Sequence, residues 1–305
     1  MKRMTSVLAV TTAAILGLSA CGGGSDPLDT SSPAASGSAS GGGSVVIGSA
    51  DFPESELLAE IYAGALKAKG IEATTKPRIG SREIYLKALE DGSIQAVPEY
   101  TGALGFFYDK AFAETDPEKV YTSVQELLPE EFTMLEKSAA EDNDSIVVTK
   151  ETADSQQLKT IADLKGKAGE LSLGAPPEFK ARPQGVPGLT KTYGVTFGSF
   201  RELTGQALVQ ALKNGQVDAA NIFTTDPSIA ENGFVSLEDT EKLFGSQNIV
   251  PLVAKDQSEQ MAPALNAVSA ALTTEVISGL LKQTVTDKKD AKDVAAEFLK
   301  SNNLG

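Results

Sequence analysis

Two aromatic residues, each followed by a threonine, occupy matching places in an internal similarity of the chain. Residues 87–96 and 210–219 match in pattern without a gap, and each copy predicts the end of a helix, a glycine and the start of a strand. Continuing both copies leads to Tyr100 and Phe223. Ligands of open α/β sheets bind beyond the carboxyl ends of the strands, so the pattern predicts that both rings face a ligand. Chance similarity is the alternative, because Ala-Leu-x-x-Gly is a common helix ending.

The composition excludes most catalytic and metal chemistry. The 305 residues include no histidine and one cysteine, which removes Ser-His-Asp and Cys-His nucleophile pairs, the usual zinc sites that contain histidine, and an internal disulfide. A net charge of −14 and a pI near 4.6 argue against nucleic acid as a partner. We therefore expect neither an enzyme nor a bound cofactor or metal.

The N-terminus has the pattern of a secretory signal. Two basic residues precede an apolar run over residues 6–18, and small residues then precede Cys21. The segment Leu-Ser-Ala-Cys at 18–21 resembles a bacterial lipobox, in which the cysteine is acylated and becomes the mature N-terminus. That resemblance implies a signal peptide over 1–20 and a lipid anchor on Cys21. An ordinary signal peptide with an incidental cysteine is the alternative.

Residues 21–44 predict a flexible, lipidated tether. They are almost all Gly, Ser, Ala, Pro and Thr, which cannot bury enough apolar surface to fold. The folded part then starts at Val45 and is long enough for two lobes of about 100 to 150 residues each.

Strand patterns alternate with helix patterns along the folded part, which predicts an α/β sheet in each half. Buried-strand patterns occur at 45–49, 71–76, 94–97, 146–149, 171–173 and 217–223. Helix patterns occur from 53 to about 70 and at 83–90, 160–164, 205–213 and through most of 257–299.

Several short motifs together resemble the substrate-binding lipoproteins of osmoprotectant ABC transporters, which take up glycine betaine, choline, carnitine or proline betaine. The resemblance covers residues 45–300, and its motifs lie at 49–54, 80–83, 98–102, 176–182, 187–189 and 223–226. It implies a type II periplasmic-binding fold, in which two α/β lobes close on the solute about a hinge. We place the two crossings near 143–148 and 246–252. Lobe one is then 45–145 plus 250–305, and lobe two is 146–249.

The resemblance also implies partners and a location. The chain is expected to be an extracytoplasmic, membrane-anchored monomer that binds a small solute resembling glycine betaine and delivers it to an ABC transporter permease.

A quaternary ammonium has no N–H to donate, so its recognition relies on aromatic faces, whereas a carboxylate is bound by a guanidinium. Carried over by motif, Tyr100 is a cage tyrosine and Arg182 is the carboxylate binder. Phe223 stands where many members have tyrosine, and Gln247 replaces another tyrosine. Our predicted ligand-binding set therefore comprises Phe52, Tyr100, Arg182, Phe223, Thr224 and Gln247.

The cage is incomplete by comparison with the family. A polar stretch at 142–145 replaces a third tyrosine, and Ala50 and Ala103 stand where some members have Lys and Thr. An aromatic pair with Gln247 and Asp144 would also suit a less methylated, more polar or amino-acid-like cation, which we keep as the alternative function.

Two other classes of function compete with solute binding. A hydrolase with paired carboxylates would use Glu99 and Asp226, the acids that the motifs bring together, and needs them about 5 to 9.5 Å apart. An adhesion or signalling ectodomain would use the same two-lobed fold without transport.

Overall fold

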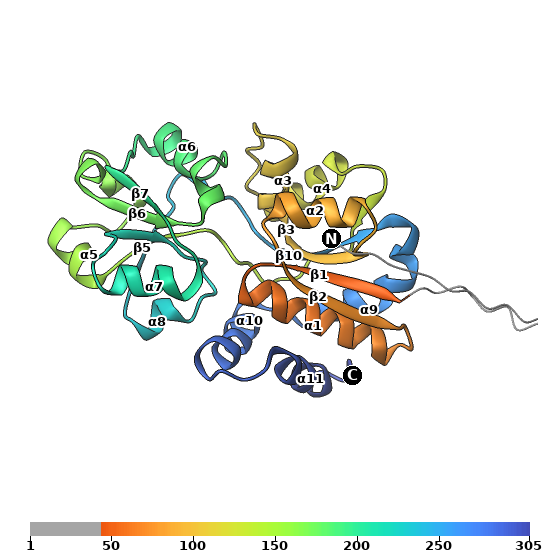
Figure 1. Cartoon of the computed structure of the whole chain (residues 1–305). Coiled ribbons are helices and arrows are strands. Elements are labelled where there is room, and N and C mark those ends of the chain that lie inside the picture. Colours follow the sequence, from red (N-terminus) through yellow and green to blue (C-terminus); the bar gives the residue numbers. More distant parts are fainter. Residues whose placement is uncertain (1–43) are drawn as a thin grey trace, which may run out of the picture. The chain divides into compact units, whose positions relative to one another are not determined.

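The computed structural model describes residues 44–305, and Figure 1 shows the chain coloured along its sequence. The predicted signal peptide, the predicted acylation of Cys21 and residues 22–43 of the predicted tether lie outside the described residues. The described part contains two five-stranded sheets.

The first sheet has the strand order β2-β1-β3-β10-β4. Strand β1 runs parallel to β2 and β3, whereas β10 runs antiparallel to β3 and β4. The strands are β1 (Val45–Ala50), β2 (Ala73–Gly80), β3 (Ala96–Tyr100), β4 (Phe132–Met134) and β10 (Ile249–Ala254). The sheet therefore joins the first strands of the described chain with its last strand.

The second sheet repeats this arrangement, with the order β7-β6-β8-β5-β9. Strand β6 runs parallel to β7 and β8, and β5 runs antiparallel to β8 and β9. Its strands are β5 (Ile146–Val148), β6 (Ser172–Ala175), β7 (Ser199–Glu202), β8 (Ala219–Asn221) and β9 (Val235–Leu237). The two copies of the internal similarity end in β3 and β8, and each of these strands lies third in its sheet.

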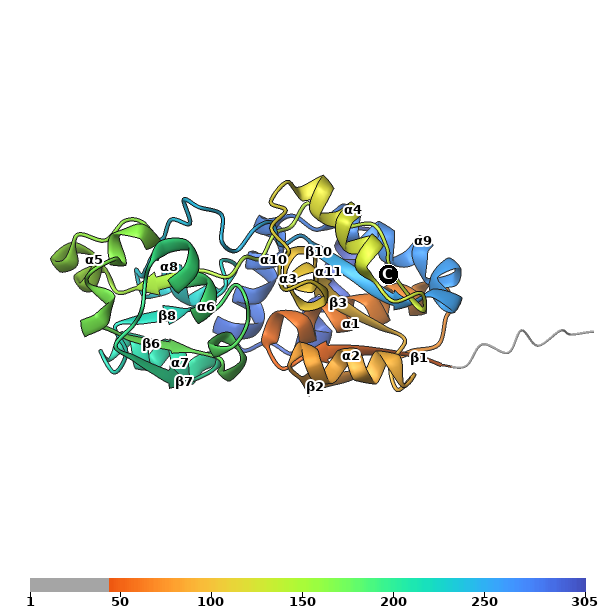
Figure 2. The ribbon, with the colours of Figure 1, turned by 90° about the horizontal axis from the view of Figure 1, so that it is seen from above.

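Helices cover both faces of the sheets. The first sheet and the helices packed around it form what we call the first half of the molecule, and the second sheet and its helices form the second half. The helices of the first half are α1 (Pro53–Ala68), α2 (Arg82–Glu90), α3 (Thr101–Tyr108), α4 (Pro117–Leu127), α9 (Ser258–Ala271), α10 (Thr274–Leu281) and α11 (Ala291–Ser301). The second half contains α5 (Lys150–Gln156), α6 (Val186–Gly188), α7 (Gly205–Lys213) and α8 (Ser228–Glu231). Figures 1 and 2 show α1 beside α11, and the two helices are in contact.

Each sheet has a hydrophobic cluster on both faces. In the first sheet, Ala96 packs with α1, α9 and α11, whereas the next residue, Val97, packs with α2, α3 and α4. In β5, Ile146 and Val148 belong to one cluster and Val147 to the other. Successive side chains of a strand point to opposite faces, which explains why these strands read as continuous apolar runs.

The chain passes between the two sheets twice, through residues 135–145 and 238–248. These connections run side by side, because the Asp142 N–H donates to the Gln247 carbonyl at 3.1 Å and Glu141 bridges Asn248 in antiparallel fashion. The paired residues lie close to both crossings predicted from the sequence.

No single helix within residues 44–305 is both long and apolar enough to cross a membrane. The segments Lys255–Ala271 and Thr274–Thr286 pass that test only as a pair, which is bent by 90°. Their apolar residues, such as Val268 and Ile277, lie in the core against α1.

Candidate solute-binding site

A cavity of about 890 Å³ is lined by residues from both halves of the molecule. Five of the six predicted ligand-binding residues line it: Phe52, Tyr100, Arg182, Phe223 and Gln247. A cavity of this size lined by both polar and apolar groups is typical of a small-molecule site.

Three aromatic rings form what we call the aromatic group of the cavity, Phe52, Tyr100 and Phe223. The Phe52 ring centroid lies 6.0 Å from that of Tyr100 and 5.4 Å from that of Phe223, with tilted planes. Phe52 precedes α1, Tyr100 ends β3, and Phe223 follows β8. Because β3 and β8 are the equivalent third strands, the repeated sheet topology brings Tyr100 and Phe223 to the same cavity.

Two buried carboxyl groups, which we call the acid pair, adjoin the aromatic group. Glu54 Oε1 accepts a hydrogen bond from the Tyr100 hydroxyl at 2.7 Å. Glu54 Oε2 and Asp142 Oδ1 lie 2.7 and 2.8 Å from the same Thr225 hydroxyl. Glu54, Asp142 and Thr225 are each 3% exposed. The pair therefore connects α1, the first crossing and the loop after β8.

Burial governs the charge of these acids. It raises the pKa of Glu54, although the hydrogen bonds from Thr225 and Tyr100 oppose that change. Burial and the neighbouring Glu54 raise the pKa of Asp142 well above its ordinary value. Burial also raises the pKa of Asp144, which lines the cavity and accepts a hydrogen bond from Asn221 at 3.0 Å.

Two arginines line the same cavity but differ in how they are neutralised. Arg82 forms two hydrogen bonds to Glu99, at 2.9 and 3.0 Å, and both side chains are buried. Burial alone would lower the pKa of Arg82, but the Glu99 carboxylate more than reverses this effect. Arg82 is thus held charged and fully paired inside the protein.

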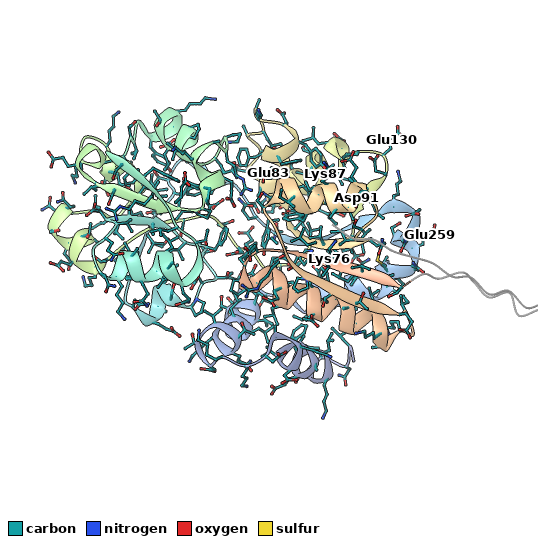
Figure 3. All side chains as sticks on the ribbon, in the orientation of Figure 1. Lys76, Glu83, Lys87, Asp91, Glu130 and Glu259 are labelled. Atoms are coloured by element: carbon teal, nitrogen blue, oxygen red, sulfur yellow. The ribbon has the colours of Figure 1, made fainter. Side chains whose placement is uncertain are left out.

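Arg182 is less firmly held. Its guanidinium lies 3.4 Å from Glu83 of α2, which is labelled in Figure 3, and 4.0 Å from Glu178. The Arg182 side chain is 24% exposed and comes from the second half of the molecule, whereas Glu83 comes from the first. A long and partly exposed pair is weak, which leaves the guanidinium available to a ligand carboxylate.

Two of the predicted ligand-binding residues, Gln247 and Thr224, form side-chain hydrogen bonds with backbone groups. Gln247 accepts from the Ala103 N–H at 2.9 Å and donates to the Phe244 carbonyl at 3.0 Å, so both ends of its amide are occupied. The structure places Thr224 outside the 890 Å³ cavity, where its hydroxyl accepts from the Asn143 N–H. Thr225 faces the cavity instead, because Thr224 and Thr225 are the central residues of a turn closed by the Asp226 N–H and the Phe223 carbonyl at 3.0 Å, and their hydroxyls have different partners.

Glu99 and Asp226 do not form a free pair of acids. Both Glu99 oxygens accept hydrogen bonds from Arg82, and Tyr85 and the Tyr100 N–H also donate to this carboxylate. Asp226 Oδ1 accepts from the Ser228 N–H at the start of α8. The Glu99 carboxylate is therefore fully engaged in hydrogen bonds within the first half of the molecule.

Glu54, Asp142 and Thr225 belong to the site but were not among the ligand-binding residues predicted from the sequence. Each had a signal in the sequence. Glu54 follows Phe52 by two positions in the first turn of a helix, Asp142 begins the polar stretch that replaces a family tyrosine, and Thr225 adjoins the residue that was chosen.

Comparisons with known proteins identify the family. Residues 43–301 match the model of the substrate binding domain of ABC-type glycine betaine transport systems. The chain belongs to this family of extracytoplasmic substrate-binding proteins, which bind a small solute for an ABC transporter and are not enzymes. The family confirms the two-lobed α/β fold that the sequence predicted.

Individual relatives agree with this membership. The glycine betaine-binding protein YehZ of Escherichia coli is 28% identical over 273 residues, which cover 84% of this chain and 90% of that protein. The carnitine transport binding protein OpuCC of Listeria monocytogenes is 25% identical, with 84% and 86% covered. A crystal structure of a glycine betaine/carnitine/choline ABC transporter shares the fold with a TM-score of 0.69 at 24% identity, covering 85% of this chain and 99% of that one.

Proposed function

We propose that this protein binds a small zwitterion with a methylated ammonium head, of the glycine betaine type, and delivers it to an ABC permease. The observation that carries the proposal is the joint presence of the aromatic group and Arg182 in one cavity. The ring faces suit the ammonium, each contributing about 0.5 to 2 kcal/mol, and Arg182 suits the carboxylate. The names of the relatives support the same class of solute.

The acids of the cavity favour a second candidate, a more polar cation with N–H groups. Glu54, Asp142 and Asp144 are acceptors that a fully methylated ammonium cannot use as hydrogen-bond partners. An amino-acid-like or less methylated solute would donate to them.

Calorimetric titration separates the candidates. The probes are glycine betaine, choline, carnitine, ergothioneine and arginine, added to the purified protein. Binding of glycine betaine tighter than that of arginine supports the first proposal, and the reverse order supports the second. X-ray scattering with saturating glycine betaine should show compaction, because a solute that touches Tyr100 and Phe223 stabilises the closed form.

We further propose that the chain is a lipid-anchored monomer. The lipobox resemblance at 18–21 supports the anchor. Acyl chains contribute about 0.8 kcal/mol per buried CH₂, so two or three chains hold a protein firmly on a membrane.

We also propose that lobe two comprises residues 146–249. The membership of β5 to β9 in one sheet supports these bounds.

Replacing Cys21→Ser should move the protein from the membrane fraction to the soluble fraction, because the acylated atom is lost. Fractionation with immunoblotting measures this, and a Ser19→Thr variant controls for a change near the cleavage site. A Cys21→Ser protein that stays on the membrane at normal abundance would rule out the anchor.

A further inference from the structure

The contacts of Thr225 require at least one proton on the acid pair, Glu54 and Asp142. The Thr225 hydroxyl oxygen lies within hydrogen-bond distance of Glu54 Oε2 and of Asp142 Oδ1, at 2.7 and 2.8 Å. A threonine hydroxyl carries a single proton, so it donates to only one of these oxygens. The other contact needs a carboxyl proton that is donated to the threonine oxygen. Two ionised carboxylates do not satisfy this geometry.

None of the other contacts of the pair within residues 44–305 brings a cation to it. Glu54 Oε1 accepts from the Tyr100 hydroxyl, and Asp142 Oδ1 also accepts from the Thr225 N–H at 3.1 Å. Neutral donors such as these stabilise one negative charge, whereas two adjacent buried negative charges repel each other. One proton shared by Glu54 and Asp142 therefore satisfies every contact described for the pair.

Other titratable groups surround the pair on each side. Tyr62 of α1, Tyr100 of β3, Asp226 of the loop after β8 and Asp144 of the first crossing act electrostatically on Glu54 or Asp142 or are acted on by them. All of these groups are neutral or negative in their usual forms. The arginines Arg82 and Arg182 act on Asp144. Among the described residues, the groups that act most strongly on Glu54 and Asp142 thus include no positive charge that would favour ionisation of both acids.

Tyr100 links the pair to the solute. Its ring belongs to the aromatic group, and its hydroxyl donates to Glu54. A cation held within about 6 Å of the ring centroid brings a positive charge next to the pair. That charge stabilises the second carboxylate and lowers the affinity of the pair for its proton.

We propose that the Glu54–Asp142 pair holds one shared proton in the solute-free protein and releases it to solvent when a cationic solute binds in the cavity. The inference rests on the proposed function, because it needs a cation against the aromatic group. It makes binding pH-dependent. When one proton is released for each solute bound, the affinity rises by up to tenfold for each pH unit.

Calorimetry in buffers of different ionisation enthalpy measures the released proton. With glycine betaine as the probe at pH 7, the observed enthalpy should vary linearly with the buffer enthalpy, with a slope equal to about one proton released per solute. Choline, which lacks a carboxylate, should give the same slope. An enthalpy that does not depend on the buffer overturns the proposal while leaving the proposed function intact.

Three variants locate the proton. Glu54→Gln and Asp142→Asn each leave a single ionisable acid at the pair, so the release should fall to zero in both. Asp144→Asn should keep the release of about one proton, whatever its effect on affinity, because Asp144 has its own partner in Asn221. Release that is lost only in Asp144→Asn would assign the proton elsewhere and overturn the proposal.

Carboxyl ¹³C NMR tests the solute-free protein without any ligand. The wild type should show a carboxyl that titrates well above the ordinary range for acids, and this signal should be absent from Glu54→Gln and Asp142→Asn but retained in Asp144→Asn, which separates it from the Asp144 carboxyl. If all carboxyls titrate in the ordinary range, the pair holds no shared proton. If neither glycine betaine nor choline binds, the proposed function fails and the coupling to solute fails with it, while NMR still decides the shared proton.

Discussion

Two buried polar clusters beside the same cavity differ in how their buried charges are compensated. The first, Arg82 with Glu99 and Tyr85, pairs opposite charges, and all of its members come from α2 and β3. The second, Glu54 with Asp142 and Thr225, joins two acids and a hydroxyl from three separate parts of the chain. The first cluster is thus equipped to stabilise one half of the molecule. The second is equipped to respond to a change of charge or of geometry.

The largest expected effect comes from breaking the first cluster. Arg82→Met leaves Glu99 buried without its guanidinium, which costs about 3 to 5 kcal/mol of unfolding free energy. Urea unfolding measures the loss. Arg78→Met is the matched control, because Arg78 is 57% exposed and its pairs should contribute at most about 1 kcal/mol. Equal losses in the two variants would remove the distinction between the clusters.

The next effect concerns Arg182, the arginine that lacks a tight partner. Arg182→Ala should weaken glycine betaine binding by about 2 to 5 kcal/mol, because the solute carboxylate loses a charged partner in a closed cleft. Phe223→Ala removes one ring and should cost about 0.5 to 2 kcal/mol. Calorimetry measures both, and choline binding should barely respond to Arg182→Ala. Sub-micromolar choline binding that depends mostly on Phe223 would contradict this ranking.

A smaller effect is expected where α3 meets the second crossing. A Cβ atom on Gly102 would lie 2.5 Å from the Ser246 carbonyl oxygen, which accepts the Gly102 N–H. Gly102→Ala should therefore cost about 1 to 3 kcal/mol through overpacking. Thermal unfolding measures the cost, with Gly169→Ala as the control because no atom lies within 4 Å of its added Cβ. An unchanged Gly102→Ala protein would mean that the crossing segments adapt freely.

The smallest effect is the pH dependence of stability. The pKa of Glu54 is raised in the folded state, so that state binds more protons than the unfolded chain. Its contribution to stability is present at low pH and is lost as the pH rises from the ordinary carboxyl range through the folded pKa, at about 1.4 kcal/mol for each pH unit in that interval. Urea unfolding from pH 5 to 8 should show a decline that Glu54→Gln reduces. A decline of equal size in both proteins would exclude Glu54 as its cause.

The sequence could predict the parts of the site that follow from local pattern. Tyr100 and Phe223 were found because a helix end, a glycine and a strand start recur in the same order. Phe52 and Arg182 were found through motifs that resemble the family. Gln247 also lines the cavity, but its amide is occupied by backbone groups from α3 and the second crossing. The sequence did not show which atoms would compete for that amide.

By itself, the sequence determined the α/β class and the alternation of strands and helices, because periodicity and turn residues act over short distances. The tertiary structure alone decided that Thr225 rather than Thr224 faces the cavity, and that Glu54 and Asp142 share its hydroxyl. These residues are far apart in the chain and meet only after both sheets have formed. Burial then sets their charge, and burial is a property of the folded assembly rather than of any segment of the sequence.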